Sequence, residues 1–401
     1  MSVPFPVRLG PAELTLIEQL TARGATAEAE RLSGAGLPTR RVESYHYTDL
    51  KMLLRAVPAL ADVSAGSAAP LLDIPGATRL VIANGAPLPA GELPEGVRVG
   101  VVDGSALTTR DAAIVRLNEG LAAQSLDLNI SGEPGIVQID RRIDGPAGHA
   151  ASSASIYVAD GAKVTIVEVF GGSDAAHVGN HATYLALGKG AQAVHITVNL
   201  TGRNAAHFAT SEYQIGESAK LRTLAINAGG ALSRTQLFPR FGGAGADADL
   251  TGLNLVDQGQ HADITLDASH AVPHTSSRPL FKSIARGRST AVVQGRLVVQ
   301  RNAQKTDAKL MSQGLMLSDE AEILTKPELE IYADDVVCGH GSTCGQLDEN
   351  SLFYLISRGI PKVEAETMLT RAFLAELLDP IEDEGLNAAL TGVIEGWLLG
   401  Q

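Results

Sequence analysis

The residues whose types and spacing could do chemistry are gathered in one short segment, DDVVCGHGSTCG, at positions 334–345. It contains both cysteines of the 401-residue chain, Cys338 and Cys344, with His340 between them. If the segment is a β-strand, Cys338 and His340 project from the same face, because side chains alternate along a strand. A thiolate and an imidazole that converge on one point suit iron, zinc or copper. The pair therefore predicts a metal site.

Two ligands do not complete a tetrahedral site, and Cys344 lies six residues beyond Cys338, across a Gly-Ser-Thr turn. An incomplete set implies that another chain or a transient ligand supplies the remaining ligands. Two further interpretations stay open. Small buried cysteines beside a hydrogen-bonded histidine are ordinary in protein cores. A Cys–His nucleophile is a poorer fit, since no third group on the strand would orient the base.

The rest of the sequence excludes several classes of protein. It has no GxxxxGK[ST] phosphate loop, no HExxH, no GxSxG and no CxxC, and no GxGxxG lies between a strand and a helix. Lys and Arg total 32 against 45 Asp and Glu, a formal charge of −13, which disfavours nucleic acid or an anionic membrane as partner. No apolar run suggests a membrane span and the N-terminal sequence does not resemble a leader. We therefore expect a cytoplasmic protein with free thiols.

Three regions would position the segment. Residues 1–145 predict a mixed α/β helical domain, with a helix starting at Pro11 and short strands at 79–85 and 97–104. Residues 146–345 predict a β-helix core, and residues 346–401 a helical domain. In the last region Asp348 can cap a helix, Asp379-Pro380 ends the next one, and a third covers about 382–399. So small a helical unit must dock on the solenoid, on a partner, or on both.

The β-helix prediction rests on an internal repeat. A turn, a small residue and alternating apolar positions recur, with alanines at 162, 191, 219 and 248 marking steps of 29, 28 and 29 residues. Weaker copies follow at 287–299 and 320–331. A constant period of strand-and-turn pattern is typical of a solenoid, in which stacked coils bury the inward side chains. The alternative is a β-sandwich with evenly spaced strands.

These residues resemble a known family. The run EIYADDVVCGHGSTCGQLDENSLFYLISRGI (330–360) is similar to the C-terminal signature of the SufB/SufD family, in its SufD branch. The similarity continues in AQKTDA (303–308), HAVPHT (270–275) and LPTRRVESYHYTDL (37–50), where His46 occupies a position that is usually basic. The SufB branch carries Arg-Cys-Asp-Ser where this chain has Lys305 to Ala308. The SufD branch is therefore favoured.

The resemblance implies a right-handed parallel β-helix flanked by N-terminal and C-terminal helical parts. It further implies a non-catalytic scaffold subunit of the SufBCD iron–sulfur cluster assembly complex. The β-helix end would pair with SufB, and the C-terminal helices would hold the SufC ATPase, which would account for the missing phosphate loop. Whether an isolated chain pairs with a second copy of itself in place of SufB stays open, and a homodimer is one alternative.

Iron or a nascent iron–sulfur cluster would be bound transiently and shared with SufB, with Cys338 and His340 matching the family's Cys-x-His positions. Cys344 stands where a small aliphatic residue is commoner, so no role carries over to it. Two alternatives remain, which are a purely structural subunit without metal ligands and a β-helix enzyme that acts on polysaccharides.

Overall fold

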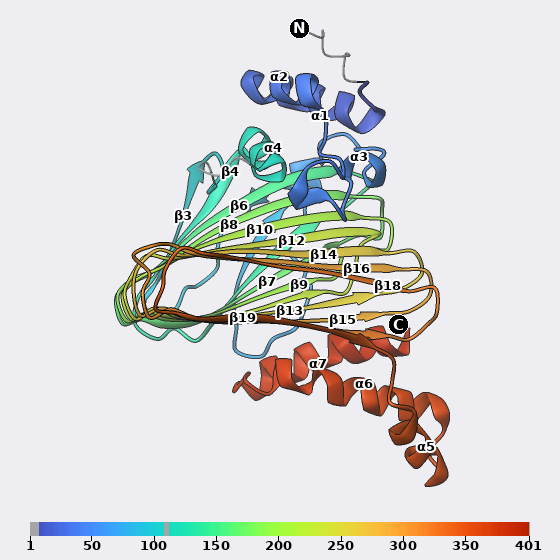
Figure 1. The fold of residues 1–401 in the computed structure, drawn as a ribbon. Helices are drawn as coiled ribbons and strands as arrows, with labels where there is room; N and C mark the ends of the chain where they lie inside the picture. Colours follow the sequence, from blue (N-terminus) through green and yellow to red (C-terminus); the bar gives the residue numbers. More distant parts are fainter. Residues whose placement is uncertain (1–7, 108–111, 401) are drawn as a thin grey trace, which may run out of the picture.

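The computed structural model describes residues 8–107 and 112–400. Its centre is a solenoid of two facing sheets, in which each coil adds one strand to each sheet (Figure 1). Helices flank the solenoid at both ends of the sequence, which confirms the predicted β-helix with N-terminal and C-terminal helical parts.

The ten-stranded sheet holds the odd-numbered strands from β5 onward together with β1 and the short strand β2. Its strands are β1 (Thr78–Ala83), β2 (Ala86–Pro87), β5 (Ile136–Ile143), β7 (Lys163–Gly172), β9 (Gln192–Asn199), β11 (Lys220–Asn227), β13 (Asp247–Val256), β15 (Ser276–Ala285), β17 (Asp307–Met316) and β19 (Val337–Gly345). The nine-stranded sheet consists of β3 (Val97–Asp103), β4 (Gln124–Ile130), β6 (His149–Val158), β8 (Val178–Leu187), β10 (Ala206–Ile215), β12 (Leu232–Phe241), β14 (His261–His270), β16 (Thr290–Val299) and β18 (Glu322–Ile331).

The two ends of the solenoid differ. At the first end, the parallel strands are closed off by antiparallel neighbours, since β2 pairs with β1 and β3 pairs with β4. At the last end, β18 pairs only with β16 and β19 only with β17. One edge of each sheet is therefore open there. Paired coils also begin before residue 146, because β1, β4 and β5 already belong to the two sheets.

A turn that needs a left-handed residue repeats along the solenoid. The residue two positions before an odd-numbered strand has positive φ in six coils, at Gly161, Gly190, Ser218, Gly245, His274 and Lys305. Glycine adopts this conformation without steric cost, which explains part of the high glycine content. His274 is one of the three residues other than glycine at this position, with Ser218 and Lys305.

The strand register corrects one detail of the predicted repeat. Lys163, Gln192, Lys220 and Asp247 are hydrogen-bonded equivalents, so the residues before them, Ala162, Ala191, Ala219 and Ala246, mark the same point of each coil. Ala248 instead pairs with Leu221, two positions further on. The coil between β11 and β13 is shorter than its neighbours, and a second alanine in GADADL concealed this in the sequence. The weaker copies at 287–299 and 320–331 form β16 and β18, which lie in the other sheet.

Small and aliphatic side chains fill most of the solenoid interior. Inward positions of successive strands form one continuous cluster that runs from Leu80 to Leu310. Phe241 and Phe281 are fully buried within it. The apolar alternation predicted from the sequence is thus the alternation between interior and outer faces.

The N-terminal helices cover the outer face of the nine-stranded sheet (Figure 1). They are α1 (Pro11–Ala22), α2 (Thr26–Ala35), the short α3 (Leu50–Leu53) and α4 (Ala113–Leu121). The predicted helix start at Pro11 and the strands near 79–85 and 97–104 are confirmed. Apolar residues of α1, α2 and α4 pack with Val178, Phe208 and Leu232 of the sheet.

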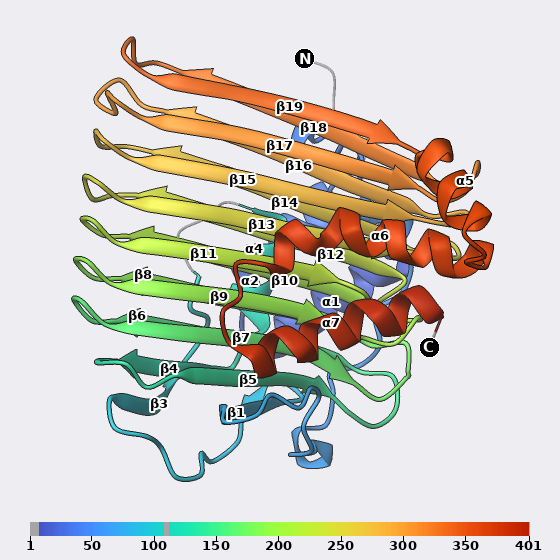
Figure 2. The ribbon, with the colours of Figure 1, turned by 90° about the horizontal axis from the view of Figure 1, so that it is seen from below.

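The C-terminal helices are α5 (Glu349–Ser357), α6 (Lys362–Leu378) and α7 (Glu384–Leu399). The Asp348 side chain accepts a hydrogen bond from the Ser351 backbone at 2.7 Å, as predicted for a helix cap. Figure 2 shows α6 and α7 lying across the outer face of the ten-stranded sheet, with α5 beside the end of β19. Leu386, Leu390 and Ile394 are buried against that sheet. The helical unit therefore docks on the solenoid.

Helices long and apolar enough to cross a membrane do not occur within residues 8–107 and 112–400.

Candidate functional site

The segment that carries Cys338 and His340 forms β19, the strand at the open edge of the ten-stranded sheet (Figure 2). In its register with β17, Cys338 lies beside Ala308 and His340 beside Leu310. Both β17 residues are buried in the interior cluster. Since paired residues of neighbouring parallel strands point the same way, Cys338 and His340 share the face that looks into the solenoid.

Further contacts support this orientation of β19. Cys338 packs against the interior cluster while remaining half-buried. Ser342, two residues beyond His340, lies 2.7 Å from the hydroxyl of Thr325 on β18, so these side chains meet across the interior. Because no later coil covers this rung, the inward face that is closed elsewhere is open to the outside here, and His340 is exposed. The predicted pair therefore lies at a solenoid end that another molecule can reach.

Burial sets the protonation of the thiols. It raises the pKa of the Cys338 thiol, a hydrogen bond from the Ala308 backbone opposes the rise, and the nearby Asp307 carboxylate adds to it. Burial also raises the pKa of Cys344, against a hydrogen bond with the Gly345 backbone. Both thiols are thus held protonated at neutral pH, and a metal ion must displace the Cys338 proton to bind.

Cys344 lies on the same face as Cys338 but does not join it. A β-strand rises about 3.3 Å per residue, so the six-residue separation puts the two cysteines roughly 20 Å apart. The Cys344 sulfur instead lies close to Gly314, where a Cβ would come within 3.2 Å of it. One metal ion cannot bind both thiols.

A complete metal site is not formed by the described parts of the chain, where no three His, Cys, Asp or Glu side chains are grouped closely enough to hold an ion. Cys338 and His340 are consequently a partial set. What the arrangement can do chemically is contribute one sulfur and one nitrogen ligand to a site that something else completes.

A network of polar side chains around a histidine of β9 is buried inside the solenoid. His195 lies 2.9 Å from both Glu168 and the Tyr213 hydroxyl inside the solenoid. Glu168 also accepts hydrogen bonds from Arg141 at 2.5 Å and Thr183 at 2.7 Å, and the Arg141 and Glu168 side chains are fully buried. Despite this burial, the charge of Arg141 and the hydrogen bond to His195 lower the pKa of Glu168 to about 2.

Sequence analysis missed this interior network, which holds a charge pair in an otherwise largely apolar core. The signal was present, because Arg141 and Glu168 occupy inward positions in the strand patterns IVQIDRRI and TIVEVF. Without the register between β5 and β7, nothing in the sequence pairs the two charges.

The N-terminal segment 43–48, within the family-like run 37–50, is a structural anchor on the outer face of the nine-stranded sheet. The Thr48 hydroxyl donates to Asp263 of β14, and Asp263 forms a buried ion pair with Arg234 of β12. Arg234 also donates to the Ser44 carbonyl at 2.7 Å and stacks on Tyr45. Glu43 pairs with Lys326 of β18, which makes the segment span several coils.

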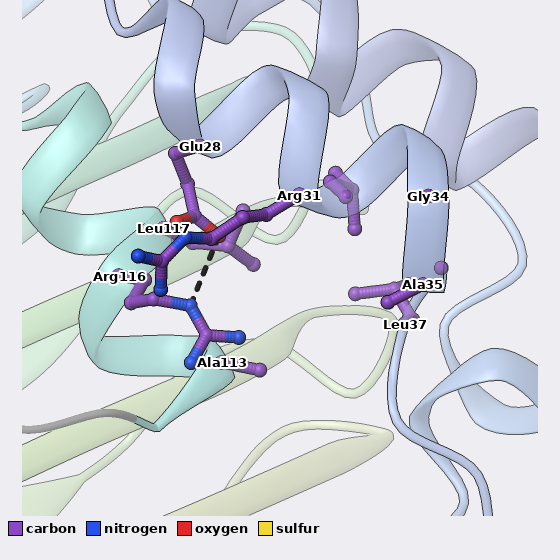
Figure 3. Close-up of a pocket in the computed structure, with 10 residues that line it drawn as sticks. Glu28, Arg31, Gly34, Ala35, Leu37, Ala113, Arg116 and Leu117 are labelled. Carbon is purple, nitrogen blue, oxygen red and sulfur yellow. Dashed lines mark hydrogen bonds and ion pairs between the residues drawn. The ribbon is translucent and has the colours of Figure 1, made fainter.

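Figure 3 shows a pocket of about 320 Å³ that lies on the N-terminal helices α2 and α4 and not on β19. Glu28 and Arg116 form an ion pair across it at 3.2 Å, and Leu32, Leu37 and Leu117 contribute apolar wall. Burial raises the pKa of Glu28 despite this pair. Glu28 is held by this ion pair, and the pocket lies far from β19, so we assign it no part in the candidate site.

Comparison with known proteins identifies the family. Residues 142–373 match the family model described as "SUF system FeS cluster assembly, SufBD core domain". The iron–sulfur cluster assembly protein SufD of Escherichia coli is 30% identical over 379 residues, which is 90% of this chain and 90% of that protein.

Two further relatives match over shorter lengths. SufBD family iron–sulfur cluster assembly proteins of Synechocystis and Mycobacterium tuberculosis are 32% and 34% identical over 246 and 200 residues. These matches cover 59% and 48% of this chain, and the chain spans about half the length of each of these two relatives. The chain belongs to the SufBD family of iron–sulfur cluster assembly proteins and is SufD-like.

Proposed function

We propose that this chain is a non-catalytic scaffold subunit of a SufBCD-type complex in the cytoplasm. Its open solenoid end pairs with a SufB subunit, its C-terminal helices dock a SufC ATPase, and Cys338 and His340 bind iron or a nascent cluster that SufB shares. The observation that carries the proposal is the position of the Cys-x-His pair on the last, uncapped coil of the solenoid.

The open end has the properties of a pairing surface. β18 and β19 expose unpaired backbone groups along 10 and 9 residues, whereas the opposite end is blunted by antiparallel strands. Proteins usually protect such edges with charges or proline, as β18 (EILTKPELEI) does, yet β19 (VCGHGSTCG) contains no Asp, Glu, Lys, Arg or Pro and is the unprotected edge of the two. Exposed Ile331, Tyr332 and Val337 add an apolar rim. A second solenoid that added its own edge strands would satisfy these groups.

Pairing at this edge would complete the metal site. The partner's strand would lie beside β19 and bring its own side chains next to the inward face that bears Cys338 and His340. The missing ligands are then supplied in trans, which fits the partial set within this chain. Thiolate and imidazole are ligands found in iron–sulfur proteins.

The C-terminal helices present a separate docking surface. Phe353 and Tyr354 of α5 and Val363 and Met368 of α6 are exposed, Phe353 and Val363 to 73% each. Aromatic and methionine side chains are enriched at protein–protein interfaces. They face away from the apolar cluster that holds the helices on the sheet, so an ATPase subunit can bind them while the solenoid keeps its fold.

The test of the ligand role is cluster formation by the complex co-expressed with its SufB and SufC partners. His340→Ala and Cys338→Ser should each lower the iron and sulfide content of the purified complex by about tenfold or more, since each removes a ligand. Cys344→Ser is the matched control and should leave the cluster content unchanged.

The His340→Ala and Cys338→Ser variants should both still copurify with SufB and SufC. Unchanged cluster content in the His340→Ala and Cys338→Ser variants would reject the ligand role and favour a purely structural subunit. Membership of the family already speaks against the polysaccharide-acting alternative.

A further inference from the structure

The two cysteines of β19 are placed symmetrically about the middle of the strand. β19 runs from Val337 to Gly345, so Gly341 is its central residue. Cys338 lies three positions before Gly341 and Cys344 three positions after it. Because both positions are an even number of residues apart, both cysteines lie on the inward face. A strand with this pattern can face a second copy of itself with unlike cysteines opposite each other.

The backbone of β19 leaves the same residues free to pair. The Val337 amide donates to the Thr306 carbonyl at 2.9 Å, which directs the odd-numbered residues of β19 toward β17. Hydrogen-bonding directions alternate along a strand, so the amides and carbonyls of the even-numbered residues point to the open edge. Cys338 and Cys344 are among them. A strand added at this edge would therefore bond directly to both cysteine residues.

Full overlap with a second copy of β19 fixes the register. In a pair of antiparallel strands related by a two-fold axis, the longest overlap sets Gly341 opposite Gly341 of the second copy. Cys338 then lies opposite Cys344 of the second copy, once on each side of the axis. Opposed residues of antiparallel strands have Cα atoms about 4.5 to 5.5 Å apart, within the range of about 4.4 to 6.8 Å that a disulfide spans.

The same two cysteines cannot join within one chain. Their six-residue separation on an extended strand keeps them roughly 20 Å apart. A second copy in this register is thus the arrangement that brings the thiols of Cys338 and Cys344 together.

The edge of the other sheet carries charges that suit the same axis. The Thr325 hydroxyl of β18 lies 2.7 Å from that of Ser342, the residue after the midpoint of β19, so the axis passes β18 close to Lys326 and Pro327. Two β18 strands paired about Pro327 would set Lys326 opposite Glu328 of the second copy, on both sides of the axis. Opposite charges that face each other across a strand pair are stabilising. Both sheet edges therefore favour a second copy as the occupant.

We propose that, in the absence of SufB, this chain pairs with a second copy of itself through β19 and is locked by two disulfides, each joining Cys338 of one copy to Cys344 of the other. The locked dimer covers the open edge and engages the Cys338 sulfur, so it can neither pair with SufB nor bind a metal there. That consequence rests on the proposed function, whereas the disulfide-linked dimer does not.

The oxidant is a small disulfide such as glutathione disulfide. Cys344 is the more exposed of the two cysteines, and its thiolate attacks one sulfur of the oxidant, whose S–S bond breaks and releases one glutathione thiolate. The Cys338 thiolate of the other copy then attacks the Cys344 sulfur and releases the second glutathione thiolate. The two released thiolates take up the two protons lost by the cysteines. A thiol reductant reverses both steps, so the lock is transient in a reducing compartment.

Oxidation of the purified chain with glutathione disulfide tests the pairing. On a non-reducing gel the wild-type chain should run as a covalent dimer, and dithiothreitol should return it to the monomer. Cys338→Ser alone and Cys344→Ser alone should stay monomeric, because like cysteines of the two copies lie roughly 20 Å apart in this register. An equimolar mixture of the two variants should form the covalent dimer, since it restores one unlike pair.

The two variants are matched controls for each other, because each retains one cysteine and the same overall sequence. A covalent dimer formed by either variant alone, in the amount given by the mixture, would show that the cysteines react without this register. Failure of the mixture to cross-link while both variants keep the melting temperature of the wild type would overturn the proposal.

Addition of SufB separates this inference from the proposed function. The reduced chain should bind SufB, and the oxidised dimer should bind it only after dithiothreitol is added. An oxidised dimer that binds SufB as well as the reduced chain does would overturn the lock at β19. A reduced chain that fails to bind SufB would contradict the proposed function, and the cross-linked dimer of the mixed variants would still stand.

Discussion

At the scale of single residues, the sequence was informative where chemistry and strand alternation coincide. Two residues apart on a predicted strand, Cys338 and His340 had to share a face, and the register with Ala308 and Leu310 shows which face it is. Exposure of that face could not be predicted from the local sequence. It depends on β19 being the last strand of its sheet, which only the complete set of strand pairs establishes.

Metal loading should depend on pH through Cys338. A metal binds the thiolate, and burial raises the pKa of this thiol, so the neutral form must lose a proton on loading. Imidazole binds as the neutral base, so acid opposes both ligands. We expect the affinity of the assembled complex for Fe²⁺ to rise as the pH increases from 6 to 8, and to change less steeply in Cys338→Ser. An equal pH dependence in wild type and Cys338→Ser would contradict proton displacement from Cys338.

The buried pair of Arg141 and Glu168 predicts a non-additive response to mutation. Glu168→Gln leaves Arg141 without its counter-charge inside the solenoid and should destabilise the fold by about 3–5 kcal/mol. Replacing both charges, in Arg141→Met/Glu168→Leu, should cost less than Glu168→Gln alone. Urea unfolding of the single and double variants provides the comparison, and additive losses would show that the charges do not stabilise each other.

At the scale of elements, the internal repeat predicted the fold class but not the residue at which every coil begins. The alanine period predicted stacked coils correctly because four successive strands of the ten-stranded sheet are each preceded by a buried alanine, at Ala162, Ala191, Ala219 and Ala246. It failed at β13, where Ala246 and Ala248 both fit the pattern and only backbone pairing distinguishes them. The anchor formed by residues 43–48 was equally hidden, since Thr48 and Asp263 lie 215 residues apart.

Positive charge added to the outward face of β19 should prevent another strand from pairing with its open edge. Gly339 and Thr343 lie on the outward face of β19, where a side chain at Gly339 meets nothing within 4 Å. Gly339→Lys/Thr343→Lys should therefore leave the melting temperature of the isolated chain nearly unchanged. The same double variant should sharply reduce its pairing with SufB, because lysines protect strand edges.

Met311→Lys is the control for this variant, since Met311 lies on the same outward face of the neighbouring strand β17, which is paired on both sides. Analytical ultracentrifugation of the mixed subunits measures the pairing. A double variant that paired as well as Met311→Lys would show that the β19 edge is not the interface.

At the scale of the whole molecule, two sheets are braced on opposite faces, by N-terminal helices on one and by C-terminal helices on the other (Figure 1). Several histidines are buried within this arrangement. Burial lowers the pKa of His149 and of His270 to about 4, and burial with the charge of Arg141 lowers that of His207 to about 3.

These histidines predict acid-sensitive folding. Each pKa is lowered below the unfolded value of 6.5, so its contribution to stability is complete above pH 6.5 and is lost as the pH falls toward 4. For His149 the loss is about 3 kcal/mol. Glu168 adds a second loss between about pH 4.5 and 2, because its pKa is lowered in the fold. Thermal melting should therefore show a falling Tm below pH 6.5, and a constant Tm from pH 6.5 to 4 would contradict this account.

The central claim is that one chain holds half of a metal site and a paired subunit holds the rest. Titration with Co²⁺ tests it most directly, because cobalt–thiolate bonds absorb in the near ultraviolet. The absorption should appear at low metal concentration in the complex of this chain with SufB and should decrease in Cys338→Ser. It should be absent when the chain is titrated alone as a monomer. Equal cobalt–thiolate absorption in the isolated monomer, or a complex whose absorption is unaffected by Cys338→Ser, would contradict the shared site.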